Sequence, residues 1–323
     1  QPYQSRDLFS SFASTLDIAG EDSYYAVLLM DGDDMGKWFA GEKRLANLPS
    51  ERPIDQYREI SKRLASFAKE AVPKIVNDDH KRKGRLVYAG GDDVLAFAPV
   101  DRVLELAQKL YDAFRDPHAG LGPEATASMG IVIAHAKDPL YAVLQQVRDA
   151  EKAAKNYLSP HNSAVRKNAF TLAYLARSGE IRKVVLPWSI NEEGIRPMEL
   201  LQTVLEKVNI RISSTFFYSF GQSLLPLLGS EIGRKGKAKF QPILFADQPD
   251  SQQLPTEALQ SELKRLLTRA AKNKEAEKDI PQLVEALTAL HRALPSTFQF
   301  IQLLQIIRNL GGDSLGSDYP ESR

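Results

Sequence analysis

Two short acidic stretches have the residue types and spacing that metal-dependent chemistry requires. The first, DGDD, begins at Asp31 directly after the apolar run YYAVLLM. The second, GGDD, places Asp92 and Asp93 inside the otherwise apolar LVYAGGDDVLAF. If the two stretches meet in the fold, three or more carboxylates share one small volume.

Crowded carboxylates favour a bound cation. Three carboxylates within about 4 Å of one another repel by roughly 4 kcal/mol per pair at an effective dielectric constant near 20. Raised pKa values or a cation relieve that repulsion, and a cluster of oxygen ligands suits a hard ion such as Mg²⁺ or Mn²⁺. Such ions usually share their coordination shell with substrate phosphates, so this pattern predicts two-metal phosphoryl or nucleotidyl transfer. The competing interpretation is structural, because Gly and Asp are also common in turns.

The elements around the acids favour the catalytic interpretation. Residues 24–31 are predicted to form a buried strand, and residues 85–99 a strand–turn–strand hairpin whose turn needs the positive φ of Gly90 and Gly91. Adjacent strands of this length bring Asp31 beside Asp92. Asp34 is a candidate N-cap for a helix that starts after DGDD, and the N–H groups of that helix would meet a triphosphate.

The order of elements predicts an α+β fold followed by a helical bundle. The first part reads strand, helix, hairpin, helix, strand, helix, strand, which indicates helices covering one face of a largely antiparallel sheet. From about Pro197 the sequence consists of amphipathic helical runs, one of which we expect to start at Asp279 and Pro281. We therefore expect a lead-in segment at 1–22, a first domain at 23–190 and a helical bundle at 191–323.

Composition excludes several classes of site. The chain of 323 residues has no cysteine, which rules out disulfides and thiolate metal sites. Its net charge of +1 gives no overall attraction to nucleic acid or membranes. No apolar run approaches the roughly 20 residues of a membrane helix. These features predict a cytoplasmic protein with no membrane partner.

Five segments in order resemble one known family: LLMDGDDMGKWFAG, LVYAGGDDVLAFAP, SMGIVIAHAKDPL, AEKAAK and AYLARSGE. Together they look like the second palm domain of the type III CRISPR large subunit, with the best match to Cmr-type complexes. The GGDD hairpin is similar to the palm of GGDEF diguanylate cyclases and class III nucleotide cyclases. The resemblance covers residues 24 to about 190 and implies a ferredoxin-like palm, or nucleotide-cyclase, fold.

The resemblance implies an activity and a set of site residues. The family makes cyclic oligoadenylates from ATP in prokaryotic RNA-guided complexes, so it implies as partners the other subunits, guide and target RNA through them, and a second palm domain. By motif position, Asp31, Asp92 and Asp93 would be catalytic ligands of two Mg²⁺ or Mn²⁺ ions, with the carbonyl of Gly32 as a further ligand. Lys155 resembles the lysine that reaches the triphosphate in related palms. The remaining nucleotide-binding candidates lie in the same two motifs: Gly32, Asp33, Asp34, Met35, Gly90 and Gly91.

Some features depart from the family pattern. In the diguanylate cyclase pattern, an acidic residue and then Phe follow Gly-Gly-Asp. Here Asp93 is followed by Val94, which argues against that subfamily. The chain has no counterpart of the family's first palm or zinc-binding region, so we expect a fragment or a compact relative, weak or inactive by itself. Two alternatives to an oligoadenylate synthase remain: a catalytically silent nucleotide-binding scaffold of the same complex, and a stand-alone nucleotide cyclase.

Overall fold

A computed structural model describes residues 24–45, 52–77, 84–159, 166–190, 194–224 and 253–310. It contains two compact units. The first unit holds the described residues up to Ile181 together with Val185–Trp188. The second holds Arg182–Val184 and the described residues from Ser189 onward. The lead-in segment expected at 1–22 lies outside the described residues.

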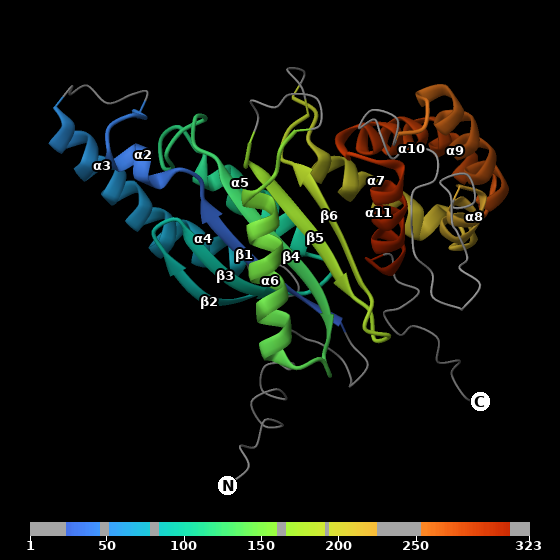
Figure 1. Ribbon diagram of the computed structural model, residues 1–323, viewed down its shortest axis with the longest axis horizontal. Helices are drawn as coiled ribbons and strands as arrows, with labels where there is room; N and C mark the ends of the chain where they lie inside the picture. The colour runs from blue at the N-terminus through green and yellow to red at the C-terminus, as the bar shows by residue number, and fades with distance from the viewer. Residues whose placement is uncertain are drawn as a thin grey trace, which may run out of the picture. The chain divides into compact units, whose positions relative to one another are not determined.

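The first unit alternates strands and helices along the chain (Figure 1). Its elements are β1 (Tyr24–Gly32), α2 (Met35–Phe39), α3 (Pro53–Ser66), the π-helical turn η1 (Phe67–Ala71), α4 (Val72–Val76), β2 (Arg85–Gly90), β3 (Asp93–Ala98), α5 (Val103–Phe114), β4 (Ala127–His135), α6 (Leu140–Lys155), β5 (Ala169–Leu175) and β6 (Ile181–Pro187), the last of which is divided between the two units.

The strands form one six-stranded sheet in the order β2-β3-β1-β4-β5-β6. The strand β1 is central, antiparallel to β3 on one side and to β4 on the other. The hairpin β2–β3 closes with Gly90 opposite Asp93, and β4 and β5 form the parallel pair. This mostly antiparallel sheet with helices confirms the predicted fold class. The C-terminal end of β1 and the turn of the β2–β3 hairpin lie at the same end of the sheet.

Helices cover both faces of the sheet, so the expectation of one covered face is wrong. On one face, α6 packs Val143 and Val147 against Val27 and Val132, and Figure 1 shows α6 lying across these strands. On the other face, α5 packs against β1 and β4. The physical reason is visible in β4, where all nine residues are buried. A strand that is apolar on both sides must be covered on both sides.

The helix α6 approaches the sheet most closely at Gly130 of β4. A Cβ atom built there would lie 2.5 Å from the backbone nitrogen of Glu151 and 2.5 Å from the backbone oxygen of Val147. Only glycine leaves room for the helix backbone at that distance. Gly130 therefore fixes the height of α6 above the sheet, one turn before the helix ends at Lys155.

Two local features differ from the predicted elements. The helical pattern over residues 54–76 is interrupted by η1, in which the N–H of Val72 donates to the carbonyl of Phe67. Pro73 follows immediately and has no N–H to donate, which is a common reason for a local change of helical hydrogen bonding. The strand β6 was not predicted, because EIRKVVLP carries charged residues and gives only a short apolar run.

The second unit is helical over the residues described. Its helices are α7 (Pro197–Arg211), α8 (Thr215–Leu224), α9 (Thr256–Ala270), α10 (Lys274–Ala293) and α11 (Thr297–Leu310).

The start expected for α10 is wrong. The helix begins earlier, because Asn273 caps it by accepting a hydrogen bond from the N–H of Ala276 at 2.9 Å. Pro281 therefore lies inside the helix and not at its first turn. No helix in the described part of the chain has both the length and the hydropathy to cross a bilayer.

Candidate metal centre

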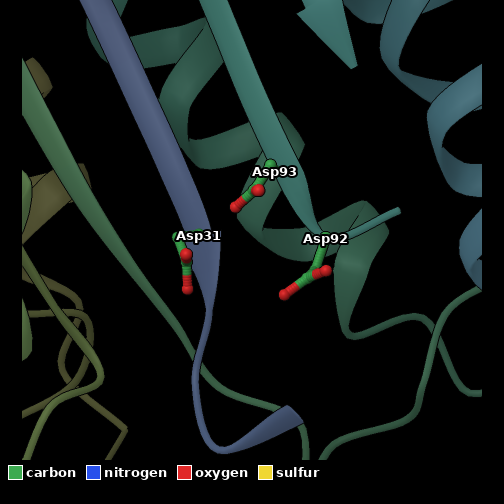
Figure 2. A group of neighbouring side chains, drawn as sticks. All are labelled: Asp31, Asp92 and Asp93. Carbon is green, nitrogen blue, oxygen red and sulfur yellow. The ribbon is translucent and has the colours of Figure 1, made fainter. Parts of the chain in front are cut away.

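Three carboxylates converge where β1 and the hairpin end. The β1–β3 register pairs Met30 with Val94, so the next pair along the ladder is Asp31 with Asp93. Asp92 lies in the two-residue turn between β2 and β3. One carboxylate oxygen from each of the three aspartates lies within 4.8 Å of the others. Figure 2 shows the three side chains pointing into one space. The sequence-based expectation that Asp31 lies near the GGDD acids is therefore met geometrically.

Gly32 lies directly against Asp92. A Cβ atom at Gly32 would be 2.8 Å from Cβ and 2.9 Å from Oδ2 of Asp92, and 3.0 Å from the ring of Phe114. The Asp92 carboxylate accepts a hydrogen bond from the backbone N–H of Gly32. The glycine of DGDD thus holds the hairpin carboxylate close to the end of β1.

The hairpin glycines have different roles. Gly91 has φ of +70°, as predicted for the turn. Gly90 does not have a positive φ, because it is the last residue of β2. A side chain at Gly90 would instead collide with the ring of Tyr88.

The crowding of the carboxylates changes their protonation. Burial, together with the hydrogen bond and negative charge of Asp31 and the charge of Asp92, raises the pKa of Asp93 to about 7. Burial also raises the pKa of Asp92, and the charge of Asp31 adds to this effect. The cluster therefore holds protons at a pH where ordinary aspartates are ionised, and a cation would displace them.

Lys155, the last residue of α6, contacts this cluster. Its Nζ lies 2.5 Å from Oδ2 of Asp31 and 3.2 Å from Oε1 of Glu151. Burial disfavours the charge of Lys155, but the bonds to Asp31 and Glu151 outweigh it and raise the pKa of the ammonium group. Burial raises the pKa of Glu151 even though Lys155 is near. Glu151 was not predicted as a site residue; its spacing of four residues before Lys155, which puts both on one helix face, was the available signal.

Asp33 lies elsewhere, in contrast to its predicted contact with nucleotide. It is 1% exposed. Its carboxylate accepts hydrogen bonds from Ser128 Oγ at 2.8 Å and from the backbone N–H of Asn168 at 3.0 Å. Its own N–H donates to the carbonyl of Thr126 at 2.8 Å. Asp33 therefore fastens the β1–α2 turn to the start of β4 and to the segment before β5.

Asp34 is half-buried and paired with two lysines. It occupies the position before α2 with φ of +55°, and its side chain makes no capping hydrogen bond, so the predicted N-cap contact is absent. It instead pairs with Lys167 at 2.5 Å and Lys37 at 3.3 Å, which lowers its pKa. Met35, a predicted nucleotide contact, is the first residue of α2 and is partly exposed.

The donor set suits a hard divalent cation. In the part of the chain that the structure describes, Asp31, Asp92 and Asp93 form the one group of three potential metal ligands. All the donors are carboxylate oxygens, which Mg²⁺ and Mn²⁺ prefer and which softer metals do not. Burial and the neighbouring Asp31 and Asp92 raise the pKa of Asp93, so the cluster favours a proton or a cation. The residues present therefore fit such an ion.

Comparisons with known proteins agree with this geometry. A family model described as Cas10/Cmr2, second palm domain, matches residues 24–165. The CRISPR system Cmr subunit Cmr2 of Pyrococcus furiosus is 34% identical over 197 residues, which is 55% of this chain and 21% of that protein. The subtype III-A protein Cas10/Csm1 of Methanocaldococcus jannaschii is 28% identical over 160 residues, 45% of this chain and 19% of its own length. The chain thus aligns with about a fifth of each relative.

Solved structures share the fold over a larger part of the chain. A cryo-EM structure of type III-B Cmr-beta in its apo state matches with a TM-score of 0.52 at 15% identity, covering 83% of this chain and 36% of that one. Cmr-beta bound to cognate target RNA matches with the same TM-score and covers 84% of this chain. Taken with the acidic hairpin beside β1, these matches lead to one conclusion: residues 24–165 match the second palm domain of Cas10/Cmr2 and have its fold.

Proposed function

We propose that this palm domain binds ATP with two Mg²⁺ or Mn²⁺ ions and, when a second palm faces it, joins ATP molecules into cyclic oligoadenylates. The observation that carries the proposal is the convergence of Asp31, Asp92 and Asp93 within 4.8 Å at one edge of the sheet. Asp31, Asp92 and Asp93 would hold the ions, with the carbonyl of Gly32 as a further ligand. Bound ions would polarise the α-phosphate and favour ionisation of the attacking hydroxyl.

The reaction is nucleotidyl transfer. The 3′-oxygen of one ATP forms a bond to the α-phosphorus of another, the bond to pyrophosphate breaks, and the hydroxyl proton passes to solvent. Lys155 is the candidate for pairing with the triphosphate, because it ends α6 beside Asp31. Glycines at 90 and 91 keep the hairpin turn free of side chains that would obstruct the nucleotide.

One acidic cluster accounts for one nucleotide. Holding two reactants in line is worth on the order of 7–11 kcal/mol of the barrier, so losing one of two facing sites should nearly abolish turnover. We therefore propose that the second palm comes from the rest of a large subunit or from another copy of the chain. The other partners we propose are the remaining subunits of the complex and, through them, guide and target RNA in a prokaryotic cytoplasm.

A second candidate is a nucleotide-binding scaffold without turnover. One observation favours it: Lys155 already neutralises part of the acidic cluster through Asp31. A palm that never binds metal would be stabilised by such a pair. The two candidates predict the same nucleotide contacts and differ in whether metal is bound.

The test is incubation of the chain with each labelled nucleoside triphosphate and Mn²⁺, alone and within a complete complex, with products identified by mass spectrometry. The proposal expects cyclic products from ATP that disappear in Asp92→Asn. Asp149→Asn serves as the control, because Asp149 is exposed on α6 and the charge change is the same. Nucleotide binding that needs no metal, without any product in the complete complex, would favour the scaffold.

A further inference from the structure

The acidic cluster already contains a cation that belongs to the chain. Lys155 Nζ lies 2.5 Å from Asp31 Oδ2, and the two side chains are 32% and 29% exposed. Glu151 Oε1 is the second partner of the same ammonium group, at 3.2 Å. Lys155 thus bridges a predicted metal ligand and a carboxylate outside the three-aspartate cluster.

A divalent ion that binds Asp31 competes with this contact for the same carboxylate. A metal ligated by Asp31 would lie within a few ångströms of Nζ, and two positive charges at that distance repel strongly in a partly buried site. This repulsion favours movement of the ammonium group away from Asp31 when metal binds. Glu151 offers a place to move to, because it is on the same helix, one turn earlier, and already in contact.

We propose that Lys155 is an exchangeable counter-ion of the metal centre, and that Glu151 is the positioning residue that retains it after exchange. Metal displaces Lys155 from Asp31, Glu151 keeps the ammonium group at the end of α6, and the freed charge becomes available to a triphosphate. Metal and nucleotide then assist each other's binding, because each removes a competitor of the other. This inference rests on the proposed function and adds the order of events at its site.

The position of Glu151 in the fold supports this role. Its backbone nitrogen lies over Gly130, where α6 is closest to β4. The helix backbone therefore cannot shift easily at this point, and Glu151 projects from a fixed place. The part that moves in the proposed exchange is the long side chain of Lys155, because its rotatable bonds allow it to change partner.

The exchange predicts that removing a charged residue of the site strengthens metal binding. Lys155→Met should bind Mn²⁺ more tightly than wild type in the absence of nucleotide, by roughly tenfold, because the internal competitor is gone and its charge no longer repels the metal. When α,β-methylene-ATP is added, the Mn²⁺ affinity of this variant should increase less than that of wild type. Lys152→Met removes an exposed lysine from the same helix and should leave both values within about twofold of wild type.

Glu151 is tested through a double-mutant cycle. Glu151→Gln should weaken Mn²⁺ binding several-fold, because displaced Lys155 loses its alternative partner. In a Lys155→Met background the same change should have almost no effect, since Glu151 acts through Lys155. A purely electrostatic or structural role of Glu151 would weaken Mn²⁺ equally in both backgrounds, and that outcome would overturn the positioning role.

The measurement is the electron paramagnetic resonance signal of free Mn²⁺, with thermal unfolding of each metal-free variant as the folding control. Amine acetylation of the wild-type chain gives a second readout that needs no variant: Mg²⁺ should increase the reactivity of Lys155, and added nucleotide should reduce it again. Unchanged Mn²⁺ affinity in Lys155→Met, or unchanged acetylation with Mg²⁺, would overturn the exchange alone. A wild-type chain that binds no Mn²⁺ at all would overturn the proposed function instead.

Discussion

Asp31 and Asp93 face each other from neighbouring strands, and after burial the proximity of Asp31 is the main cause that raises the pKa of Asp93. A carboxyl group with a raised pKa keeps its proton at a pH where an ordinary aspartate has lost it. The metal-free cluster is therefore a proton-binding site as well as a candidate metal site. Its pH behaviour distinguishes it from three isolated surface aspartates.

Metal binding should weaken as the pH falls below neutrality. The pKa of Asp93 is raised to about 7, and the metal requires the ionised form. Competition by a single proton at that pKa makes Mn²⁺ binding roughly tenfold weaker at pH 6 than at pH 8. Titrations followed by calorimetry in two buffers of different ionisation enthalpy would also detect the released proton. A flat profile between pH 6 and 8 would contradict the raised pKa of Asp93.

The stability of the metal-free protein should show the opposite dependence. Asp93 has a folded-state pKa above its ordinary value of 3.8, so the folded chain binds more protons than the unfolded chain between these values. The contribution of Asp93 to the free energy of unfolding is present at low pH and is lost as the pH rises through about 7. Asp93→Asn imitates the protonated form, so it should gain stability relative to wild type at pH 8 and little at pH 4. Urea unfolding at the two pH values, with chelator present, measures the difference, and equal differences would refute it.

Gly32→Ala should damage both stability and metal binding. The new methyl group would lie 2.8 Å from Cβ of Asp92 and 3.0 Å from Phe114, so Asp92 must move. Overpacking of this kind costs about 1–3 kcal/mol, and a displaced ligand weakens Mn²⁺ binding as well.

Gly36→Ala is the matched control for Gly32→Ala. Gly36 lies four residues further on, in α2, where a Cβ atom meets nothing within 4 Å. It should be neutral or stabilising by up to about 1 kcal/mol, because alanine is the better helix former. Chemical unfolding and Mn²⁺ titration of both variants test the pair. Equal behaviour of the two alanines would show that the contact between Gly32 and Asp92 is unimportant.

Asp33→Ala should destabilise the first unit without removing a nucleotide contact. The substitution leaves Ser128 Oγ and the N–H of Asn168 buried without their acceptor, which costs about 1–3 kcal/mol for each group that stays unpaired. We expect a lower urea midpoint but a nearly unchanged ATP affinity for the folded molecules, measured at low temperature. A loss of ATP affinity with unchanged stability would restore Asp33 to the nucleotide site. Asp149→Asn again serves as the exposed control.

The sequence indicated the acidic centre because its signals are local. An apolar run that ends in acids and a hairpin that encloses acids remain recognisable without tertiary information, so Asp31 and the GGDD turn were found. The different contacts of Asp31, Asp33 and Asp34 could not be predicted. Three nearly adjacent aspartates look alike in the sequence until the partners of their side chains are known. Those partners, Lys155, Ser128 and Lys167, come from distant segments.

The errors in the predicted fold have similar physical causes. Pro281 resembled a helix start because proline is favoured there, yet the capping side chain of Asn273 begins α10 earlier. The coverage of both faces by helices was missed because the order of elements indicated a sheet with one covered face. The β4 segment is buried along its whole length, so it must be covered on both sides. Glu151 was overlooked because a glutamate four residues before a lysine is ordinary on any exposed helix.

The central place of β1 also has a consequence for folding of the chain during its synthesis. Asp31 lies early in the chain, Asp92 and Asp93 follow with the hairpin, and Lys155 comes only at the end of α6. On the ribosome, the three acids therefore emerge well before the lysine that neutralises them. The nascent palm must wait for β4 to pair with the free edge of β1 and for α6 to dock over Gly130. Until then the acids remain without their internal cation. A chain that ends before α6 has all three aspartates but lacks Lys155.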